Sequence, residues 1–386
     1  MSPNKANTNK RRSMPSGSPY VFVTYNLHSL YGHVAVIDPI NDQLQRRIPV
    51  EANAGPMAMD PTEKKLYVVN TGSDTVTVID TNNFDILASI FVGNDQFTNS
   101  GIAAVFVAPY GDKAYVANFN DRAVTIINTK TDKVTTKVDV GSGKPFAFAS
   151  NEKSSFVYVA CRVADGRDYI VAFSIEDNIG YQYGNELNLT FDETRNPLTV
   201  SPDGNTQITL GTNGILCFFD DDVKGQPTTL SLLDNTVSAV YLDNKLLFCT
   251  SQEGKSYLKR IIDLTVSPNG QISYDDFKDI NSFKGQDKIR FSRNQKYIGI
   301  TIQPTVLPRA GLQIYNSTGT QSRYVSLPSV GDLAFYSDTK AYVGELQAIR
   351  PIDLETATAL PVITIGSYDT TPVQVKNIIS GYRNQS

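Results

Sequence analysis

The sequence Leu-Tyr-Val-Val-Asn at residues 66–70 returns as Ala-Tyr-Val-Ala-Asn at residues 114–118. In each case a second β-rich run follows ten residues later, at residues 76–80 and 124–128, and each run ends in Asp or Asn. A pair of strands that recurs at a fixed spacing is typical of a repeat architecture. This repeat is the strongest indication of the fold in the sequence.

The aromatic position of the repeated strand can be followed along the whole chain. Its eight anchor residues are Phe22, Tyr67, Tyr115, Tyr158, Ile208, Leu247, Ile298 and Tyr342. Neighbouring anchors lie 39 to 51 residues apart, close to the period of roughly 40–50 residues expected for a four-stranded propeller blade.

The segments around each anchor indicate four strands per repeat. A short apolar strand and a tight turn precede the anchor, as in residues 56–64, where Pro61 suits a turn corner. A third strand follows and usually ends in Asp or Asn, and a fourth often ends in Val-Gly or Ile-Gly. We therefore expect an all-β, closed β-propeller of four-stranded antiparallel blades. We count eight blades, or seven if a degenerate repeat at 155–205 or 245–285 is miscounted.

The two ends of the chain predict how the ring closes. Residues 372–379 have the sequence of an innermost strand, and no further anchor strand follows them. Phe22 lies on an anchor strand that lacks an innermost strand before it. We expect the C-terminal strand to complete the first blade, since closure hides sheet edges that would otherwise be exposed.

Composition favours a single repeat domain over residues 19–382. The chain has 386 residues, of which 19% are charged, with a formal net charge of −4. Residues 1–18 contain Lys5, Lys10, Arg11 and Arg12 and no acidic residue, and we expect them to form a disordered basic tail. No apolar segment has the length of a transmembrane helix, and no standard signal peptide is visible.

The sequence contains few signals of catalysis. The three cysteines, Cys161, Cys217 and Cys249, fall in separate repeats, which favours buried free thiols. The only histidines, His28 and His33, lie in one predicted hairpin with no metal-ligand spacing. No nucleophile elbow, phosphate-binding loop or dinucleotide motif appears. We expect no cofactor, no metal and no catalytic residue.

The predicted topology gathers certain loops at one end of the ring. The three longest connections from a second to a third strand are residues 25–33, 161–168 and 303–310, and the connection 93–101 adds polar amides. Long loops on a rigid scaffold commonly bind ligands, and Tyr and Arg are favoured contact residues. The candidate binding residues are Tyr25, His28, Tyr31, His33, Arg162, Arg167 and Arg309.

The blocks at 66–80 and 114–128, with Val140-Gly141 after the second, resemble the YVTN family of β-propeller repeats. That family occurs in bacterial and archaeal surface-layer and secreted proteins and in YncE-like proteins. The resemblance implies a propeller without a shared catalytic motif, although related propellers include lactonases that act on sugar lactones. Members are often exported. Without a visible signal peptide, this chain is expected to be cytoplasmic or surface-associated through a non-classical route.

Three functions remain open at this point. The favoured one is a non-enzymatic scaffold that recognises a protein, a glycan or another polymer through its loop-rich face. The second is a lactonase-like or quinoprotein-like enzyme, which would need clustered Arg, Asp or Glu at the channel mouth. The third is nucleic-acid binding through the basic tail, which the acidic net charge disfavours. The oligomeric state is not determined by the sequence.

Overall fold

The fold is that of a computed structural model. It describes residues 19–380 except 29, 95–98, 184–188, 193–195, 203, 205, 213, 221–227, 232–234, 243–244, 253–254, 264–272, 283–284, 293, 304–309, 320 and 367–372. Only the backbone is described at 181–183, 206–209, 219–220, 228, 235–237, 242, 245, 247–252, 255–263, 273–282 and 374. The predicted basic tail, residues 1–18, lies outside the described residues.

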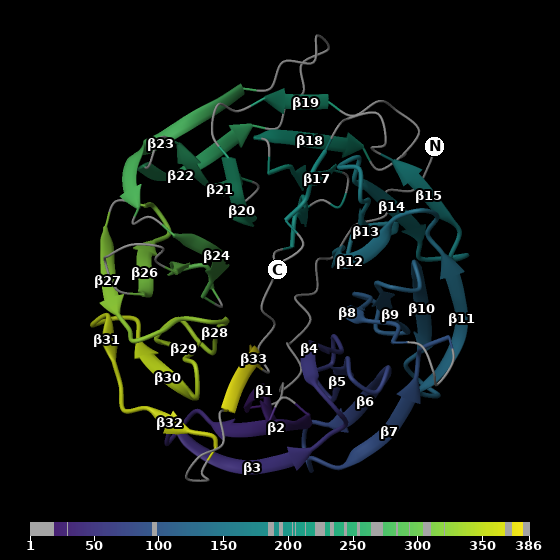
Figure 1. Cartoon of the computed structure of the whole chain (residues 1–386). Helices are drawn as coiled ribbons and strands as arrows, with labels where there is room; N and C mark the ends of the chain where they lie inside the picture. The colour runs from purple at the N-terminus through teal and green to yellow at the C-terminus, as the bar shows by residue number, and fades with distance from the viewer. Residues whose placement is uncertain are drawn as a thin grey trace, which may run out of the picture.

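The described backbone forms strands and turns without a helix, and the strands assemble into eight antiparallel sheets (Figure 1). Sheet 1 contains β1 (Val21–Leu27), β2 (Tyr31–Asp38), β3 (Gln43–Pro49) and the C-terminal β33 (Val373–Ser380). Sheet 2 contains β4 (Ala54–Met59), β5 (Lys65–Asn70), β6 (Thr75–Asp80) and β7 (Ile86–Phe91). Sheet 3 contains β8 (Ile102–Val107), β9 (Lys113–Asn118), β10 (Ala123–Asn128) and β11 (Lys133–Asp139). Sheet 4 contains β12 (Lys144–Ala149), β13 (Phe156–Arg162), β14 (Tyr169–Ser174) and β15 (Gly180–Tyr183).

The remaining four sheets follow the same order. Sheet 5 contains β16 (Leu198–Val200), β17 (Thr206–Leu210), β18 (Ile215–Asp220) and β19 (Thr228–Ser231). Sheet 6 contains β20 (Asn235–Leu242), β21 (Lys245–Gln252), β22 (Lys255–Asp263) and β23 (Ser273–Ser282). Sheet 7 contains β24 (Gln286–Phe291), β25 (Tyr297–Ile302), β26 (Gly311–Asn316) and β27 (Ser322–Ser326). Sheet 8 contains β28 (Leu333–Phe335), β29 (Lys340–Gly344), β30 (Ala348–Asp353), and the short β31 (Thr358–Ala359) and β32 (Ile363–Thr364), which both pair with β30.

The eight predicted anchor residues all lie in second strands, namely β1, β5, β9, β13, β17, β21, β25 and β29. In sheet 2 the two middle strands, β5 and β6, are buried along nearly their whole length. The outer β7 is mostly exposed. Neighbouring sheets cover both faces of a middle strand, which explains why its sequence is a continuous apolar run.

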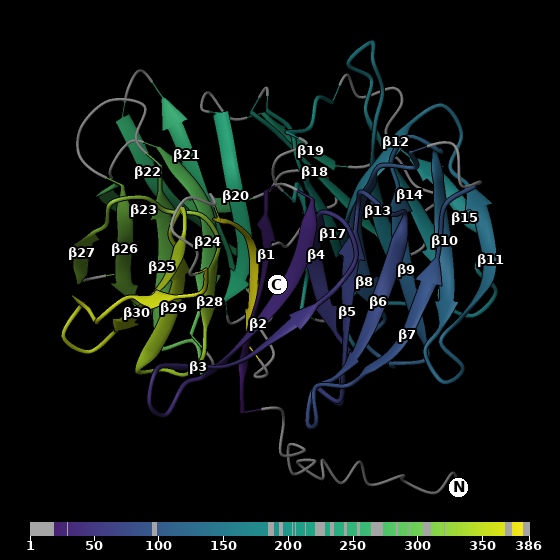
Figure 2. The ribbon, with the colours of Figure 1, turned by 60° about the horizontal axis from the view of Figure 1, so that its bottom comes forward.

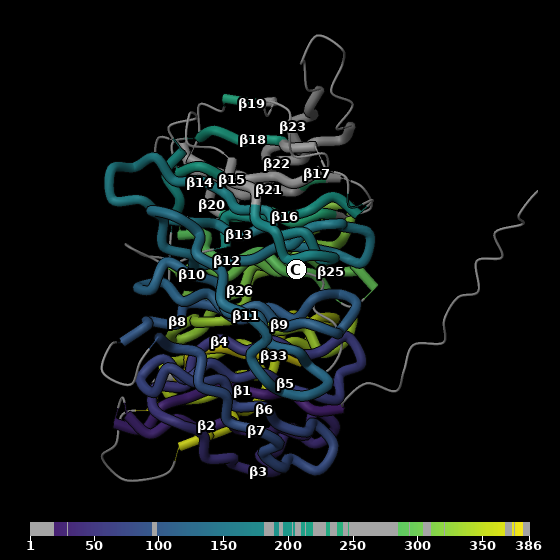
Figure 3. The backbone as a smooth tube through the Cα atoms, turned by 90° about the vertical axis from the view of Figure 1, so that its right-hand side faces the viewer, coloured from purple at the N-terminus to yellow at the C-terminus, as the bar shows by residue number. Residues whose placement is uncertain are grey.

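The C-terminal strand belongs to sheet 1, as the chain ends predicted. β33 pairs antiparallel with β1, with Val21 opposite Ser380 and Leu27 opposite Val373. The innermost strands contact one another in the order β33, β4, β8, β12, β16, β20, β24 and β28, and β28 in turn contacts β33. Figures 1 and 3 show the sheets arranged around a central axis, face-on and from the side.

Antiparallel order divides the connections between the two ends of this ring (Figure 2). The connections from second to third strands and from fourth strands to the next sheet meet at one end, here called the loop-bearing end. The turns from first to second and from third to fourth strands meet at the other, the turn-bearing end. Residues 28–30 belong to the loop-bearing end and residues 39–42 to the turn-bearing end.

At the turn-bearing end, a lysine that precedes the anchor by two residues reaches the next sheet. Lys65 Nζ lies 2.6 Å from Asp132 Oδ2 in the β10–β11 turn. Asp132 adopts the left-handed conformation, φ 51°, which Asp and Asn tolerate better than most residues. The hydroxyl of the anchor Tyr67 donates to the same carboxylate over 3.3 Å. Lysine and anchor together therefore join sheet 2 to sheet 3.

The same contact recurs at two other pairs of sheets. Lys113 Nζ lies 3.0 Å from Asn178 Oδ1, which joins sheet 3 to sheet 4. Lys340 Nζ lies 3.0 Å from Asp42 Oδ2, which joins sheet 8 to sheet 1. Between sheets 1 and 2 an aromatic contact takes the same place: the ring centroids of Tyr20 and Phe84 lie 4.9 Å apart.

Two of the three cysteines behave as predicted. Cys161 and Cys217 are buried and free, and burial raises the pKa of both thiols. Both thiols therefore stay protonated near neutral pH. The side chain of Cys249 is outside the described part of the structure. None of the described residues forms a helix that is long and apolar enough to cross a bilayer.

Candidate functional site

The first hairpin differs from its prediction as a long loop. β1 and β2 pair along their whole length, with Tyr25 opposite His33 and Leu27 opposite Tyr31. Only residues 28–30 connect them, so the expected loop 25–33 is wrong. His28 makes the short turn possible by adopting a left-handed conformation with φ 52°.

The register places several side chains on the face of sheet 1 that looks toward sheet 8. Alternate residues of a strand share a face, so His33 and its partner Tyr25 lie on the same side as Ala35 of β2. Arg47 of β3 lies opposite Ala35 and therefore also on this side. The core between these sheets contains Tyr25 together with Ile365. Strand order therefore collects these residues where sheets 8 and 1 meet.

A recess opens at this junction on the loop-bearing end. It is a cavity of about 220 Å³ lined by Tyr25, Leu27, His33, Arg47, Pro49, Ile365 and Gly366. The ring of His33 stacks on that of Tyr25, with centroids 5.2 Å apart and planes 22° apart. His33 Nδ1 lies 3.1 Å from the carbonyl oxygen of Tyr31, which fixes the imidazole in this position.

Arg47 provides a positive charge beside the recess. Its Nε donates to the carbonyl oxygen of Ile365 over 2.9 Å, which connects β3 to the segment after β32. Burial raises the pKa of the Tyr25 hydroxyl, although the Arg47 guanidinium and its hydrogen bond oppose that shift. Tyr25 therefore stays neutral near pH 7, and the guanidinium is the fixed charge of the site.

Large apolar side chains are also exposed in the β1–β2 and β29–β30 connections at the loop-bearing end of sheets 1 and 8. Leu30 and Tyr31 in the β1–β2 hairpin have exposures of 63% and 64%, and Leu346 in the β29–β30 loop of sheet 8 has 67%. Gly32 permits this arrangement, because a Cβ there would lie 2.1 Å from the carbonyl oxygen of Glu51. We refer to Leu30, Tyr31 and Leu346 as the apolar patch.

The predicted binding residues Arg162 and Arg167 do not join this site. Arg162 lies in sheet 4, close to the buried Asp168, with Nε 3.6 Å from Oδ2. Its guanidinium also donates to the carbonyl oxygen of Phe191. Arg167 is exposed and pairs with Asp165 in the same loop. Because sheets 2 and 3 separate sheet 4 from sheet 1, the two groups of candidates are distinct. Arg309 falls in the segment 304–309, outside the described residues.

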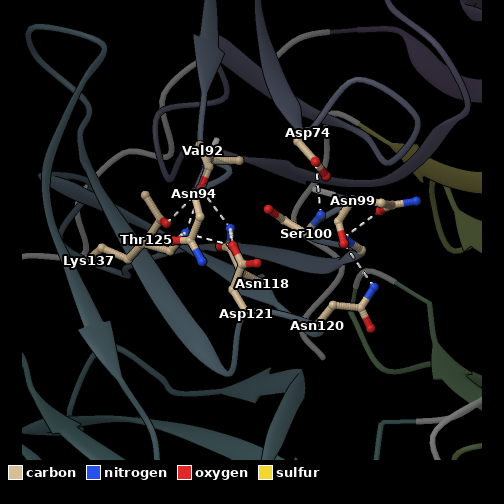
Figure 4. A network of polar contacts seen from close by, with 11 residues as sticks. Asp74, Val92, Asn94, Asn99, Ser100, Asn118, Asn120, Asp121, Thr125 and Lys137 are labelled. Atoms are coloured by element: carbon tan, nitrogen blue, oxygen red, sulfur yellow. Dashed lines mark hydrogen bonds and ion pairs between the residues drawn. The ribbon is translucent and has the colours of Figure 1, made fainter. Parts of the chain in front are cut away.

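Hydrogen bonds and ion pairs fix the described part of the connection 93–101 between sheets 2 and 3 (Figure 4). Ser100 N donates to Asp74 Oδ2 over 2.9 Å, and Asn118 Nδ2 donates to the carbonyl oxygen of Val92 over 2.7 Å. Lys137 Nζ donates to Asn94 Oδ1 over 2.6 Å and also to Asp121 Oδ2 in the β9–β10 loop. Asn94 and Asn99, two of the amides that the sequence offered as binding groups, therefore serve to position this connection. Gln96 lies outside the described residues.

A buried carboxylate is paired with a partly exposed lysine at the innermost strands of sheets 7, 8 and 1. Asp332, just before β28, accepts hydrogen bonds from Lys288 Nζ at 2.9 Å and from Asn377 Nδ2 at 2.5 Å. Burial disfavours its charge, but Lys288 and Arg290 outweigh that effect and lower the pKa of the carboxyl group. This carboxylate joins strands from sheets 7, 8 and 1, so we interpret it as a structural latch.

The described residues contain no candidate metal site. No group of three or more His, Cys, Asp or Glu side chains there is placed to hold a metal ion.

Sequence reasoning found Tyr25, Tyr31 and His33 but missed Arg47 and Leu346. Arg47 and Ile365 are 318 positions apart, so their contact has no local signal. Residues 31 and 33 occupy alternate positions of β2, and residues 47 and 49 occupy alternate positions of β3. The register of β2 and β3 therefore places all four side chains on one face of the sheet.

Comparisons with known proteins place the chain among propellers. The family model described as "Lactonase, 7-bladed beta-propeller" matches residues 36–181, which is less than half of the chain and lies within sheets 1 to 4. No curated protein matches the sequence.

Several solved structures share the fold at low sequence identity. One is dihydro-heme d1 dehydrogenase NirN in complex with DHE, with 13% identity and a TM-score of 0.71 over 94% of this chain and 75% of that chain. Another is apo AztD from Citrobacter koseri, with 15% identity and a TM-score of 0.59 over 93% and 96%. The β-propeller domain of Cps50 (Swd1) from Myceliophteria thermophila has 11% identity and a TM-score of 0.53 over 79% and 94%. These likenesses support the all-β propeller fold and carry no function.

Proposed function

We propose that this protein is a non-enzymatic recognition scaffold that binds a protein or carbohydrate partner through the loop-bearing end of sheets 8 and 1. The observation that carries the proposal is the apolar patch, three large side chains of high exposure at the same end of sheets 8 and 1 as a recess lined by a guanidinium. Exposed apolar groups of this kind, together with Tyr and Arg, are characteristic of binding surfaces. Membership of the YVTN-type propellers remains part of this proposal.

The turn-bearing end offers a matched control. Tyr110, in the turn between β8 and β9, has an exposure of 63%, nearly equal to that of Tyr31, but lies at the opposite end of the ring. A photo-cross-linking amino acid at position 31 should capture a partner that the same group at position 110 does not capture. The purified partner, or a glycan array, is then tested against Tyr31→Ala and Tyr110→Ala.

We expect Tyr31→Ala to weaken binding at least tenfold and Tyr110→Ala to leave it unchanged. Equal cross-linking at the two positions, or equal binding by the two variants, would refute recognition by this end. The folded state of both variants is checked by their urea unfolding midpoints.

The partial family match favours one other function, the hydrolysis of a lactone. We rank it second because the buried carboxylate of Asp332 is occupied by Lys288 and Asn377. Incubation with glucono-1,5-lactone in a pH-stat tests it directly. A rate that exceeds spontaneous hydrolysis in proportion to protein concentration would replace the scaffold proposal with an enzymatic one.

A further inference from the structure

We propose that the recess between sheets 8 and 1 binds the free carboxyl-terminal residue of a protein partner, with an apolar side chain in the cavity and its carboxylate on Arg47. This inference rests on the proposed function, because it names the part of the partner that the loop-bearing end recognises.

The lining of the recess suits one apolar side chain. Leu27, Pro49 and Ile365 supply aliphatic contacts, and the stacked rings of Tyr25 and His33 supply a flat aromatic wall. A cavity of about 220 Å³ is smaller than the roughly 300–1,000 Å³ of pockets for drug-sized ligands. It therefore fits a single residue better than a larger molecule.

The charge beside the recess suits a carboxylate. Among the described residues no carboxylate lies within ion-pair distance of Arg47, whose contacts are the Ile365 carbonyl and the Tyr25 hydroxyl. A guanidinium carries five donors, so Arg47 retains donors for an incoming anion. Guanidinium groups bind carboxylates through two parallel hydrogen bonds.

Sheets 8 and 1 also contain a cation that is paired with a carboxylate of the same chain. At the turn-bearing end Lys340 has the carboxylate of Asp42 as its partner, at 3.0 Å. At the loop-bearing end Arg47 has no carboxylate partner among the described residues, which leave out 367–372. A ligand that combines an apolar side chain and a carboxylate within one residue complements the recess, and a chain terminus has this form.

The test uses fluorescein-labelled Gly-Gly-Ser-Gly-Gly-Phe with a free carboxylate, the same peptide as its C-terminal amide, and Gly-Gly-Ser-Gly-Gly-Gly with a free carboxylate. Fluorescence anisotropy with the full chain measures each dissociation constant. We expect the Phe acid to bind at least tenfold more tightly than either the Phe amide or the Gly acid. Equal binding of acid and amide would overturn the proposal.

Substitutions of the two neighbouring arginines on β3 test whether the preference for the acid peptide depends on Arg47. Arg47→Gln should abolish the preference for acid over amide, and Arg47→Lys should retain part of it. The neighbouring Arg46, whose guanidinium contacts the carbonyl of Asn83 in sheet 2, provides the control, since Arg46→Gln makes the same change in net charge. An equal loss in Arg46→Gln would overturn the assignment to the recess.

A fourth peptide separates a chain terminus from an internal acid. Gly-Gly-Ser-Phe-Asp amide carries its carboxylate on a side chain, and we expect it to bind no better than the Phe amide. Tighter binding by this peptide than by the Phe acid would refute terminal recognition. If the peptides show no preference while Tyr31-dependent capture persists, this inference fails and the proposed function stands. If neither the acid preference nor capture at position 31 is found, the proposed function fails as well.

Discussion

The contact between sheets 8 and 1 is completed differently at its two ends. At the turn-bearing end Asp42 accepts from Lys340 Nζ at 3.0 Å and from the hydroxyl of Tyr342 at 2.5 Å. At the loop-bearing end Arg47 contacts a backbone carbonyl, and an apolar recess opens beside it. Both ends expose apolar side chains, Ile40 at the turn-bearing end among them. The turn-bearing end pairs its lysine with a carboxylate, whereas the loop-bearing end presents a guanidinium beside an apolar recess.

The two ends of the contact between sheets 8 and 1 therefore have different roles. The lysine–acid contact recurs between sheets 2 and 3, so it belongs to the means by which neighbouring sheets are joined. The recess uses residues that do not follow the repeat, such as Arg47 and His33. Repeated contacts hold the ring together, while departures from the repeat at the other end provide specificity.

The largest expected effect on stability concerns the latch around Asp332, which joins sheets 8 and 1 to sheet 7. Asp332→Ala should reduce the free energy of unfolding by about 3–5 kcal/mol, because it breaks an ion pair whose carboxylate is buried and leaves the buried Ile378 N–H without its acceptor. Urea unfolding followed by circular dichroism measures the change. Asp165→Ala, which removes an exposed ion pair with Arg167, should leave the midpoint unchanged. An unchanged midpoint in the Asp332 variant would show that the latch is dispensable.

The ion pair at the turn-bearing end should contribute less. Asp42→Ala removes the carboxylate acceptor of Lys340, which keeps the Pro39 carbonyl, and leaves the buried Tyr342 hydroxyl without a partner, at a cost of about 1–3 kcal/mol. A double-mutant cycle with Tyr342→Phe measures the coupling of the two side chains by urea unfolding. Strict additivity of the two changes would contradict a shared contact.

The pH dependence of stability should report on the latch when wild type is compared with an Asp332 variant. The pKa of Asp332 is lowered in the folded state by Lys288 and Arg290 against the opposing effect of burial. Its stabilising contribution is therefore complete above the unfolded value of about 3.9 and is lost as the pH falls through the lower folded pKa. The stability difference between wild type and Asp332→Asn should be constant from about pH 7 to 5 and shrink below about pH 4. A difference that grows with acid would reverse this sign.

The smallest expected effect on stability lies in the apolar patch. Tyr31→Ala should change the free energy of unfolding by less than about 0.5 kcal/mol, because the side chain is mostly exposed. The same urea experiment measures it beside Asp42→Ala. A loss as large as that of Asp42→Ala would mean that Tyr31 supports the fold, and the contrast between the two ends would disappear.

Much of the architecture could be predicted from the sequence because its signals are local. Apolar runs of strand length around Tyr67 and Tyr115, with Asp and Asn at their turns, predicted both the strands and their order. The lysine contacts also had a local signal that was not used, since Lys65, Lys113 and Lys340 all precede an anchor tyrosine by two residues. The error in the first hairpin arose because His28 adopts a conformation that composition did not indicate.

The candidate site depended on contacts that the sequence does not encode locally. Of the residues proposed from the sequence, Tyr25, His33 and the exposed Tyr31 meet at one junction, while Arg162 belongs to another sheet. Arg47 enters the site only because strand pairing brings β3 beside the segment after β32.

The sequence alone determined that the chain is a series of four-stranded sheets, because periodic apolar runs and turn residues act over short distances. The tertiary structure alone decided which charges meet a partner, because residues about 300 positions apart become neighbours only when the C-terminal strand pairs with β1. Asp42 and Lys340 meet in this way, whereas Arg47 meets a carbonyl and a recess.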